Sequence, residues 1–143
     1  MNKPSTAGDL LLLVGRVVIG AVFIAHGLQK FLEWGIAGTA QSFGQMGIPV
    51  PGVSAWVAAL VETVGGAALV LGVGLPVAGV LLALNMLGAL VFYHLPTGFF
   101  VSDADGGIEY VLVLAAASLV LAFRGGAYTL DNALTRKKDA TAA

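Results

Sequence analysis

The sequence contains no cysteine and few charged residues. Only 10% of its 143 residues are Asp, Glu, Lys or Arg, whereas a soluble domain has about 25%. The absence of thiols excludes disulfide exchange, thiolate-held metal ions and cysteine-bound iron–sulfur clusters. The net charge of −1 gives no reason to expect nucleic acid as a partner. So few charged groups cannot cover a folded surface with water-facing side chains, and we therefore predict a membrane protein.

Apolar residues make up 58% of the chain, and the mean hydropathy is +0.93. A helix needs about 20 apolar residues to cross a bilayer. We expect a single transmembrane domain over residues 1–143, of which 124–143 form a cytoplasmic tail. The fold class is all-α, an integral membrane four-helix bundle. Four stretches qualify as its spans: 10–32, 53–73, 75–94 and 107–123.

A cleaved signal peptide is the alternative interpretation of the first stretch. The apolar run is longer than the roughly 7–15 residues of a signal-peptide core, and Arg16 interrupts it. We therefore expect this stretch to be retained as the first span.

The connections between the first three spans carry their own signals. Between the second and third spans, Gly72 and Gly74 precede Pro76, which predicts a tight helical hairpin. Between the first and second spans, Ala40 and Phe43 recur with Met46 at helical spacing. This spacing predicts a short helix that lies in the membrane interface.

Basic residues predict the orientation of the bundle. Lys3 precedes the first span, and four more basic residues follow the last: Arg124, Arg136, Lys137 and Lys138. Cytoplasmic segments of membrane proteins are enriched in Lys and Arg. We therefore expect a multi-pass protein of the bacterial cell (inner) membrane with both termini in the cytoplasm. The loop with Asp103 and Asp105 then faces outward.

Ionisable residues interrupt the apolar stretches. A charge at the centre of a span costs about 2.5 kcal/mol or more, so these side chains must face other protein groups. Helical rise and the lean of side chains toward the helix N-terminus place most of them in the outer half of the bundle. We predict a polar cluster there, and we leave Arg16 near Asn85, which lies within about 5 Å of its level, both as structural polar residues. The members of the cluster are His26, Lys30, Glu62, His94 and Glu109.

The same residues fit less specific roles. Arg16 and Lys30 balance Glu62 and Glu109 in charge, so the four fit a structural network as well as a ligand or proton site. Long basic side chains also reach lipid headgroups. Two histidines with a carboxylate fit non-haem iron, and two histidines fit haem, but nothing in the sequence fixes either geometry. We assign no metal.

Several short motifs follow one another along the chain: Arg16, His26-Gly27-Leu28-Gln29-Lys30-Phe31, Gly47-Ile48-Pro49, Glu62-Thr63-Val64-Gly65-Gly66 and Phe92-Tyr93-His94. With these motifs in this order, the chain resembles the DoxX/DoxD family of small bacterial membrane proteins over Leu10 to Phe123. The resemblance implies a four-helix membrane bundle whose polar positions include those of the cluster. One branch of the family resembles the small subunit of thiosulfate:quinone oxidoreductase, and other members are associated with oxidative-stress complexes.

Our first functional hypothesis is a quinone- or quinol-interacting oxidoreductase subunit. In this hypothesis His26, Glu62 and Glu109 are catalytic, as hydrogen-bonding and proton-carrying groups. The head of a menaquinone or ubiquinone contacts a second group of residues, and a partner subunit supplies electrons. That second group is Lys30, His94, Trp56, Tyr93 and Phe31.

Two other functions stay open. One is a non-catalytic anchor or assembly subunit of an envelope redox or stress complex. The other is a carrier for a small molecule. In each case the partners are the lipid bilayer and a protein subunit or a second copy of the chain.

Overall fold

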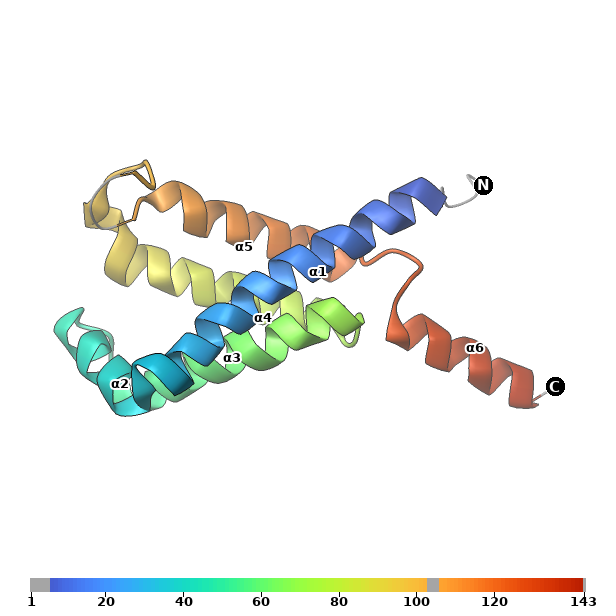
Figure 1. Ribbon diagram of the computed structural model, residues 1–143, viewed down its shortest axis with the longest axis horizontal. Coiled ribbons are helices and arrows are strands. Elements are labelled where there is room, and N and C mark those ends of the chain that lie inside the picture. The colour runs from blue at the N-terminus through green and yellow to red at the C-terminus, as the bar shows by residue number, and fades with distance from the viewer. Residues whose placement is uncertain (1–5, 103–105, 143) are drawn as a thin grey trace.

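The described part of the chain, residues 6–102 and 106–142, is helical and contains no strand in this computed structural model. The predicted all-α fold is confirmed. Lys3, Asp103 and Asp105, which entered the orientation argument, lie outside the described residues. The α-helices are α1 (Thr6–Leu28), α2 (Gly35–Gln45), α3 (Pro51–Leu71), α4 (Leu75–Ala89), α5 (Ile108–Phe123) and α6 (Leu130–Ala142) (Figure 1).

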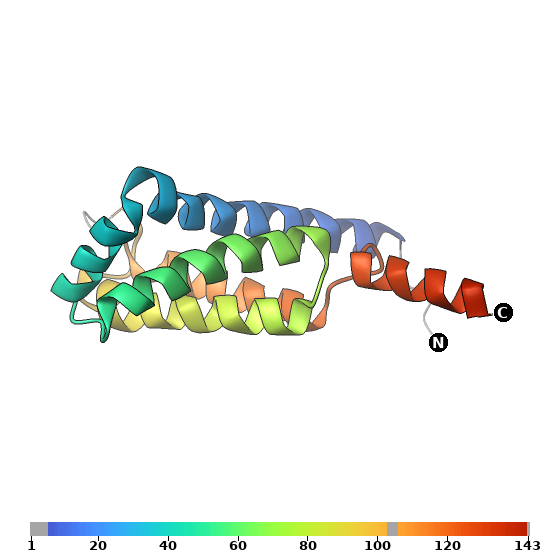
Figure 2. The same cartoon turned by 90° about the horizontal axis from the view of Figure 1, so that it is seen from below.

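Four of these helices form the bundle. α1 packs mainly against α3, α4 packs mainly against α5, and α3 turns directly into α4. The start of α1 and the whole of α6 lie at one end, which we call the inner end, and α2 lies at the opposite, outer end (Figures 1 and 2). The chain therefore runs through the bundle four times and returns to the end from which it started.

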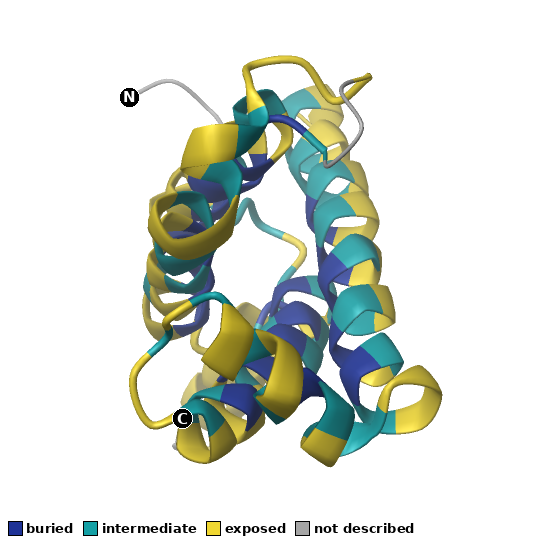
Figure 3. Cartoon of the chain, turned by 90° about the vertical axis from the view of Figure 1, so that its left-hand side faces the viewer, coloured by how far each residue is buried: buried dark blue, intermediate teal, exposed yellow. Residues whose placement is uncertain are grey.

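Three helical segments are long and apolar enough to cross a membrane: Thr6–Glu33, Pro51–Leu71 and Leu75–Thr97. α5 is apolar but has only 16 residues, so it is about 24 Å long at the usual rise of ~1.5 Å per residue. A short span requires a locally thinner bilayer or an upright position. Large apolar side chains cover the outside of the bundle, as lipid contact demands, and buried residues face inward (Figure 3).

The predicted connections are present. Gly72 and Gly74 both adopt positive φ between α3 and α4, and a proline occupies the first turn of α4, so the tight hairpin is confirmed. α2 is the predicted short helix between the first two spans. The predicted tail contains a further helix, α6, for which no element was expected.

Two helices end in π turns, in which hydrogen bonds reach back five residues. α1 continues into Gln29–Glu33 and α4 into Leu90–His94. In the first turn the Trp34 amide donates to the Gln29 carbonyl at 3.1 Å. Each wide turn shifts the direction of the side chains that follow, and such turns are frequent at functional sites. Both π turns belong to the outer end, and each carries a basic residue of the predicted cluster.

Glycines allow α1 and α3 to approach closely. A Cβ atom added to Gly20 would lie 2.6 Å from the Gly66 carbonyl oxygen, and one added to Gly66 would lie 2.7 Å from the Gly20 carbonyl oxygen. Small residues at helix crossings give this kind of backbone contact in membranes. The crossing fixes the distance between α1 and α3 below the outer end.

We expect Gly20→Ala to destabilise the bundle by about 1–3 kcal/mol, because backbone atoms of α3 cannot make way for the new methyl group. Gly15→Ala, on the same helix, is the matched control, since its nearest neighbour would lie 4.0 Å away. The midpoint of thermal unfolding in detergent measures the difference. Equal midpoints for the two variants would contradict the close crossing.

Candidate functional site

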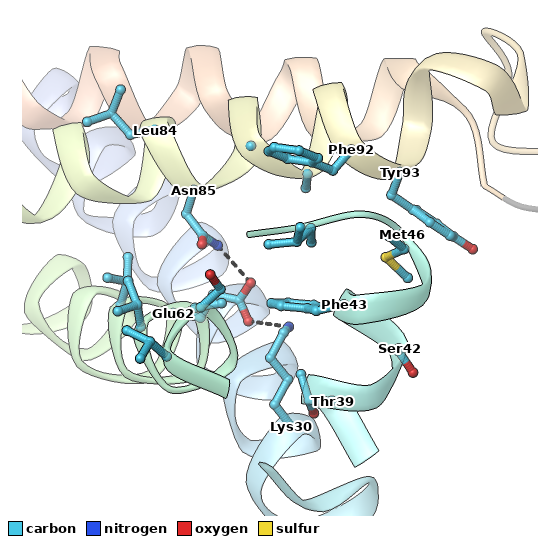
Figure 4. Close-up of a pocket in the computed structure, with 18 of the residues that line it drawn as sticks. Lys30, Thr39, Ser42, Phe43, Met46, Glu62, Leu84, Asn85, Phe92 and Tyr93 are labelled. Carbon is cyan, nitrogen blue, oxygen red and sulfur yellow. Dashed lines mark hydrogen bonds and ion pairs between the residues drawn. The ribbon is translucent and has the colours of Figure 1, made fainter. Parts of the chain in front are cut away.

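A buried ion pair lies between α1 and α3 in the outer half of the bundle. The Lys30 ammonium lies 2.6 Å from Glu62 Oε2, and the Asn85 amide donates to Glu62 Oε1 at 2.9 Å (Figure 4). Lys30 is 8% exposed and Glu62 is 3% exposed. A buried charge is tolerated only when it is paired and hydrogen-bonded. Glu62 meets this requirement with one partner from α4 and one from the end of α1.

The π turn at the end of α1 places Lys30 in this position. Its ammonium also donates to the His26 carbonyl at 3.3 Å. An ammonium has three N–H donors, and Glu62 and His26 use two of them. The third donor and the Asn85 side-chain oxygen have no hydrogen-bond partner among the described residues, and the ammonium lies 5.9 Å from the centroid of the Trp34 ring. The pair is neutral in total, and it still offers one donor and one acceptor.

A cavity of about 720 Å³ lies against this pair. Its walls are mostly apolar and come from α2, α3 and α4, with the two π turns at its outer end. Lining side chains such as Val57 (52% exposed) and Leu84 (58% exposed) also lie on the outside of the bundle. The cavity therefore opens sideways between α3 and α4, where lipid would be, and the buried Lys30–Glu62 pair lies at its inner wall.

Two residues predicted to bind quinone line the outer part of this cavity. They are Tyr93 and His94, whose rings lie 4.8 Å apart in an edge-to-face arrangement. His94 Nδ1 is hydrogen-bonded to the Gly106 carbonyl, which holds the ring at the second π turn. Two other residues predicted for the same role lie elsewhere. Phe31 and Trp56 pack on each other, with ring centroids 5.7 Å apart, and do not line the cavity.

The predicted cluster of five ionisable residues forms only in part. Lys30 and Glu62 are joined, and His94 lines the same cavity. Glu109 does not join them: its carboxylate accepts the Val101 amide at 2.7 Å and so holds the loop before α5. His26 contacts Lys30 only through its carbonyl. Its side chain turns to α5, where Nε2 lies 3.2 Å from the Tyr110 hydroxyl.

The predicted proximity of Arg16 and Asn85 is wrong. Arg16 is fully buried at the inner end, where its guanidinium donates to the Tyr128 carbonyl in the segment that precedes α6. The same segment is held by Asp9, which accepts the Ala127 amide at 2.8 Å. The segment between α5 and α6 crosses the inner end and supplies a backbone partner that the depth of Arg16 in α1 could not reveal.

Sequence reasoning missed three features of the site. It placed Asn85 near the level of Arg16. An amide side chain in an otherwise apolar helix indicates a buried hydrogen-bond partner, which here is Glu62. The same reasoning placed α2 in the membrane interface and did not foresee that Phe43 and Met46 line the cavity. It did not consider Tyr110. Among the described residues, no group of three His, Asp or Glu side chains is placed to hold a metal ion.

Comparison with known proteins agrees with the fold. The sequence model of the DoxX family matches residues 11–95. A Bacillus subtilis protein named "Putative oxidoreductase CatD" is 37% identical over 85% of this chain and 83% of its own length. An uncharacterised Haemophilus influenzae protein is 35% identical over 96% of this chain and 100% of its own length. Escherichia coli "Inner membrane protein YphA" is 32% identical over 87% of this chain and 91% of its own length. No solved structure matches significantly.

We expect Lys30→Met to destabilise the protein by about 3–5 kcal/mol, because it leaves the Glu62 carboxylate buried without a counter-charge. Glu62→Gln should have a comparable effect, because it leaves the Lys30 ammonium buried without a counter-charge. The double variant recovers much of the loss, since neither charge remains. Thermal unfolding of the four proteins gives the coupling between the two sites.

The exposed Glu33→Gln change is the control for loss of a carboxylate at the outer end. We expect it to alter stability by less than about 0.5 kcal/mol. If the two single losses simply add in the double variant, Lys30 and Glu62 do not stabilise each other.

Proposed function

The chain belongs to the DoxX family of membrane proteins, and from this premise we propose that it is a quinone-interacting subunit of a cell-membrane oxidoreductase. One observation carries the proposal: an apolar cavity, open to the lipid, ends at a neutral polar group made of Lys30, Glu62 and Asn85. Quinones are lipid-soluble, uncharged and polar only at their ring oxygens. The oxidoreductase assignment is supported by the name of the Bacillus subtilis relative.

The charge of the site favours a neutral ligand. Lys30 and Glu62 cancel each other, so an anion entering the cavity would gain no net attraction and would lose its hydration. A carbonyl oxygen, by contrast, matches the remaining Lys30 donor, and a hydroxyl matches the Asn85 oxygen. The two oxidation states of a quinone present these two groups. Thiosulfate and other anionic sulfur substrates fit the site less well.

The cavity also suits a flat ring with an apolar tail. Phe43 from α2 lies beside the Lys30–Glu62 pair, and Phe92 from the second π turn lies on the facing α4 side (Figure 4). Aromatic faces pack against planar rings in offset or edge-on arrangements. The exposed side chains Val57 and Leu84 border the exit between α3 and α4. A ligand tail leaving there would run into the bilayer.

The residues divide the chemistry as follows. A bound quinone supplies a couple that takes up two electrons and two protons, and a partner protein with its own redox cofactor supplies the electrons. Lys30 holds the ring oxygen and stabilises negative charge there. Glu62 holds or releases a proton beside that oxygen. Tyr93 and His94 line the outer part of the cavity, and His26 positions Lys30 through its carbonyl.

We place the protein in the bacterial cell membrane with both termini in the cytoplasm. The name of the Escherichia coli relative supports the membrane. The inner end of the bundle carries α6 with its basic residues Arg136, Lys137 and Lys138, and cytoplasmic segments favour such residues. The cavity then belongs to the outer half of the bilayer.

Tryptophan fluorescence tests quinone binding without added labels. The chain has only two tryptophans: Trp34 lines the cavity and Trp56 does not. In the Trp56→Phe protein in lipid nanodiscs, a short-tailed ubiquinone or menaquinone analogue should quench Trp34 with saturation. In the Trp34→Phe protein the quenching of Trp56 should rise without saturation, as it does for a quinone dissolved in lipid. The same behaviour in both proteins would contradict a bound quinone.

Filling the cavity should remove this binding. Gly88 lines the cavity, and a Cβ atom there meets open space, so Gly88→Leu should weaken binding at least about tenfold, or ~1.4 kcal/mol, without loss of stability. Gly52→Leu is the control: its Cβ atom also meets open space, and Gly52 does not line the cavity. Unchanged affinity in Gly88→Leu would mean that the quinone binds elsewhere.

A further inference from the structure

Lys30 is the one lysine that the sequence places within an apolar stretch. The other three, Lys3, Lys137 and Lys138, lie before the first span or after the last. Lys137 and Lys138 are exposed on α6, whereas Lys30 is 8% exposed and lines the cavity. A lysine amine is a nucleophile once it loses its proton, and proteins that use this chemistry often place the lysine in an apolar pocket. Binding a quinone uses only the hydrogen-bonding capacity of Lys30, not its nucleophilic nitrogen.

A proton acceptor lies next to this amine. Glu62 Oε2 is 2.6 Å from Lys30 Nζ, so a proton can pass between them within an existing hydrogen bond (Figure 4). Asn85 donates to the other carboxylate oxygen at 2.9 Å and holds the carboxylate in this position. A carboxylate within hydrogen-bond reach is the geometry that general base catalysis requires. Glu62 can therefore take up the proton that Lys30 must lose before its nitrogen reacts.

Space for a reactant lies beside the amine. The cavity of about 720 Å³ borders Lys30 and opens between α3 and α4, where Val57 and Leu84 are exposed toward lipid. A long-chain aldehyde suits this entry, because its chain is apolar and its single polar group, the carbonyl, is at one end. Such a molecule partitions into the bilayer. It would reach the amine with its carbonyl first and leave its chain in the apolar part of the cavity.

We propose that Lys30 is a covalent binding site for lipid-soluble aldehydes, which it captures as a protonated imine with Glu62 as the counter-ion. This capture goes beyond quinone binding and does not depend on it. Carboxylates within membrane bundles serve as counter-ions to bound cationic ligands. The Lys30–Glu62 pair already has the arrangement of charges that the protonated imine requires.

The reaction preserves the charge of the site and needs no oxidant or reductant. Lys30 passes one proton to Glu62, and the neutral nitrogen attacks the aldehyde carbon. A C–N bond forms, and a second amine hydrogen moves to the former carbonyl oxygen. Glu62 then returns its proton to this hydroxyl group, the C–O bond breaks and water leaves. Two of the three ammonium hydrogens depart in the water, and the third stays on the positively charged imine nitrogen.

The product can keep the shortest contact of the amine. A protonated imine has one N–H group, and Glu62 Oε2 is the acceptor that lies 2.6 Å from the nitrogen. The hydrogen bond that is lost is the longer one, to the His26 carbonyl at 3.3 Å. The Trp34 ring, whose centroid lies 5.9 Å from Nζ, is near a cation before and after the reaction. The surroundings of Lys30 therefore accommodate the imine as well as the ammonium.

The test compares two aldehydes and follows each lysine separately. Full-length protein in nanodiscs is incubated with decanal, which partitions into lipid, or with glycolaldehyde, which stays in water. 2-Picoline borane, an uncharged reductant that enters lipid, converts each imine to a stable amine, and peptide mass spectrometry gives the modified fraction. With decanal, Lys30 should react at least about tenfold faster than Lys137 or Lys138, because the cavity holds the aldehyde beside its amine. With glycolaldehyde the order should be reversed.

A matched pair of variants locates the reaction in the cavity. Gly88→Leu fills the cavity and should slow the decanal reaction of Lys30 at least about tenfold, whereas Gly52→Leu should leave the rate unchanged. Both variants keep the Lys30–Glu62 pair, and the exposed Lys137 reports equal access of the reagents in each.

Glu62→Gln removes the proton acceptor and should also slow the reaction of Lys30 at least about tenfold, with the exposed Glu33→Gln as its control. Thermal unfolding of each variant shows whether it is folded under the conditions of the reaction. The comparison of Gly88→Leu with Gly52→Leu does not depend on that result.

Three outcomes would overturn the capture of aldehydes at Lys30. The first is equal reaction of Lys30 and the two α6 lysines with decanal. The second is the same rate at Lys30 in Gly88→Leu and Gly52→Leu. The third is a preference of Lys30 for glycolaldehyde, which would mean access from water. Quinone binding is measured separately by Trp34 fluorescence in the protein without aldehyde, so the loss of one function is recognised independently of the other.

Discussion

The pairing of Lys30 with Glu62 is the interaction on which the outer half of this protein depends. Neither charge has water to reach, so each requires the other, and Asn85 satisfies the second carboxylate oxygen. The requirement holds three helices in register, because the partners come from α1, α3 and α4. Apolar packing alone would specify this register weakly, since lipid solvates apolar side chains as well as neighbouring helices do.

The scaffold meets this requirement with small residues and wide turns. The Gly20–Gly66 crossing brings α1 against α3, and the π turn after α1 directs Lys30 inward. The second π turn places Tyr93 and His94 at the outer part of the cavity. At the inner end the buried charge of Arg16 is stabilised differently, by a hydrogen bond to the backbone carbonyl of Tyr128. The two ends are therefore built for different roles, one open to a ligand and one closed.

A neutral polar group at the end of a cavity that opens to lipid favours the binding of an uncharged, lipid-soluble molecule with hydrogen-bonding oxygens. The ligand can enter between α3 and α4, where exposed apolar side chains such as Val57 and Leu84 border the cavity.

The amino-acid sequence by itself determined the all-α class, the four apolar stretches, the α3–α4 hairpin, the helix α2 and the gathering of Lys30 and Glu62. These follow from composition, helical rise and the cost of charge in lipid, which depend only on position along a helix. Which side chains meet also depends on how each helix is rotated about its axis and on where a π turn shifts that rotation. Only the tertiary structure therefore decided that Asn85 joins Glu62, that Glu109 caps a loop, that Phe31 packs on Trp56 and that the tail covers Arg16.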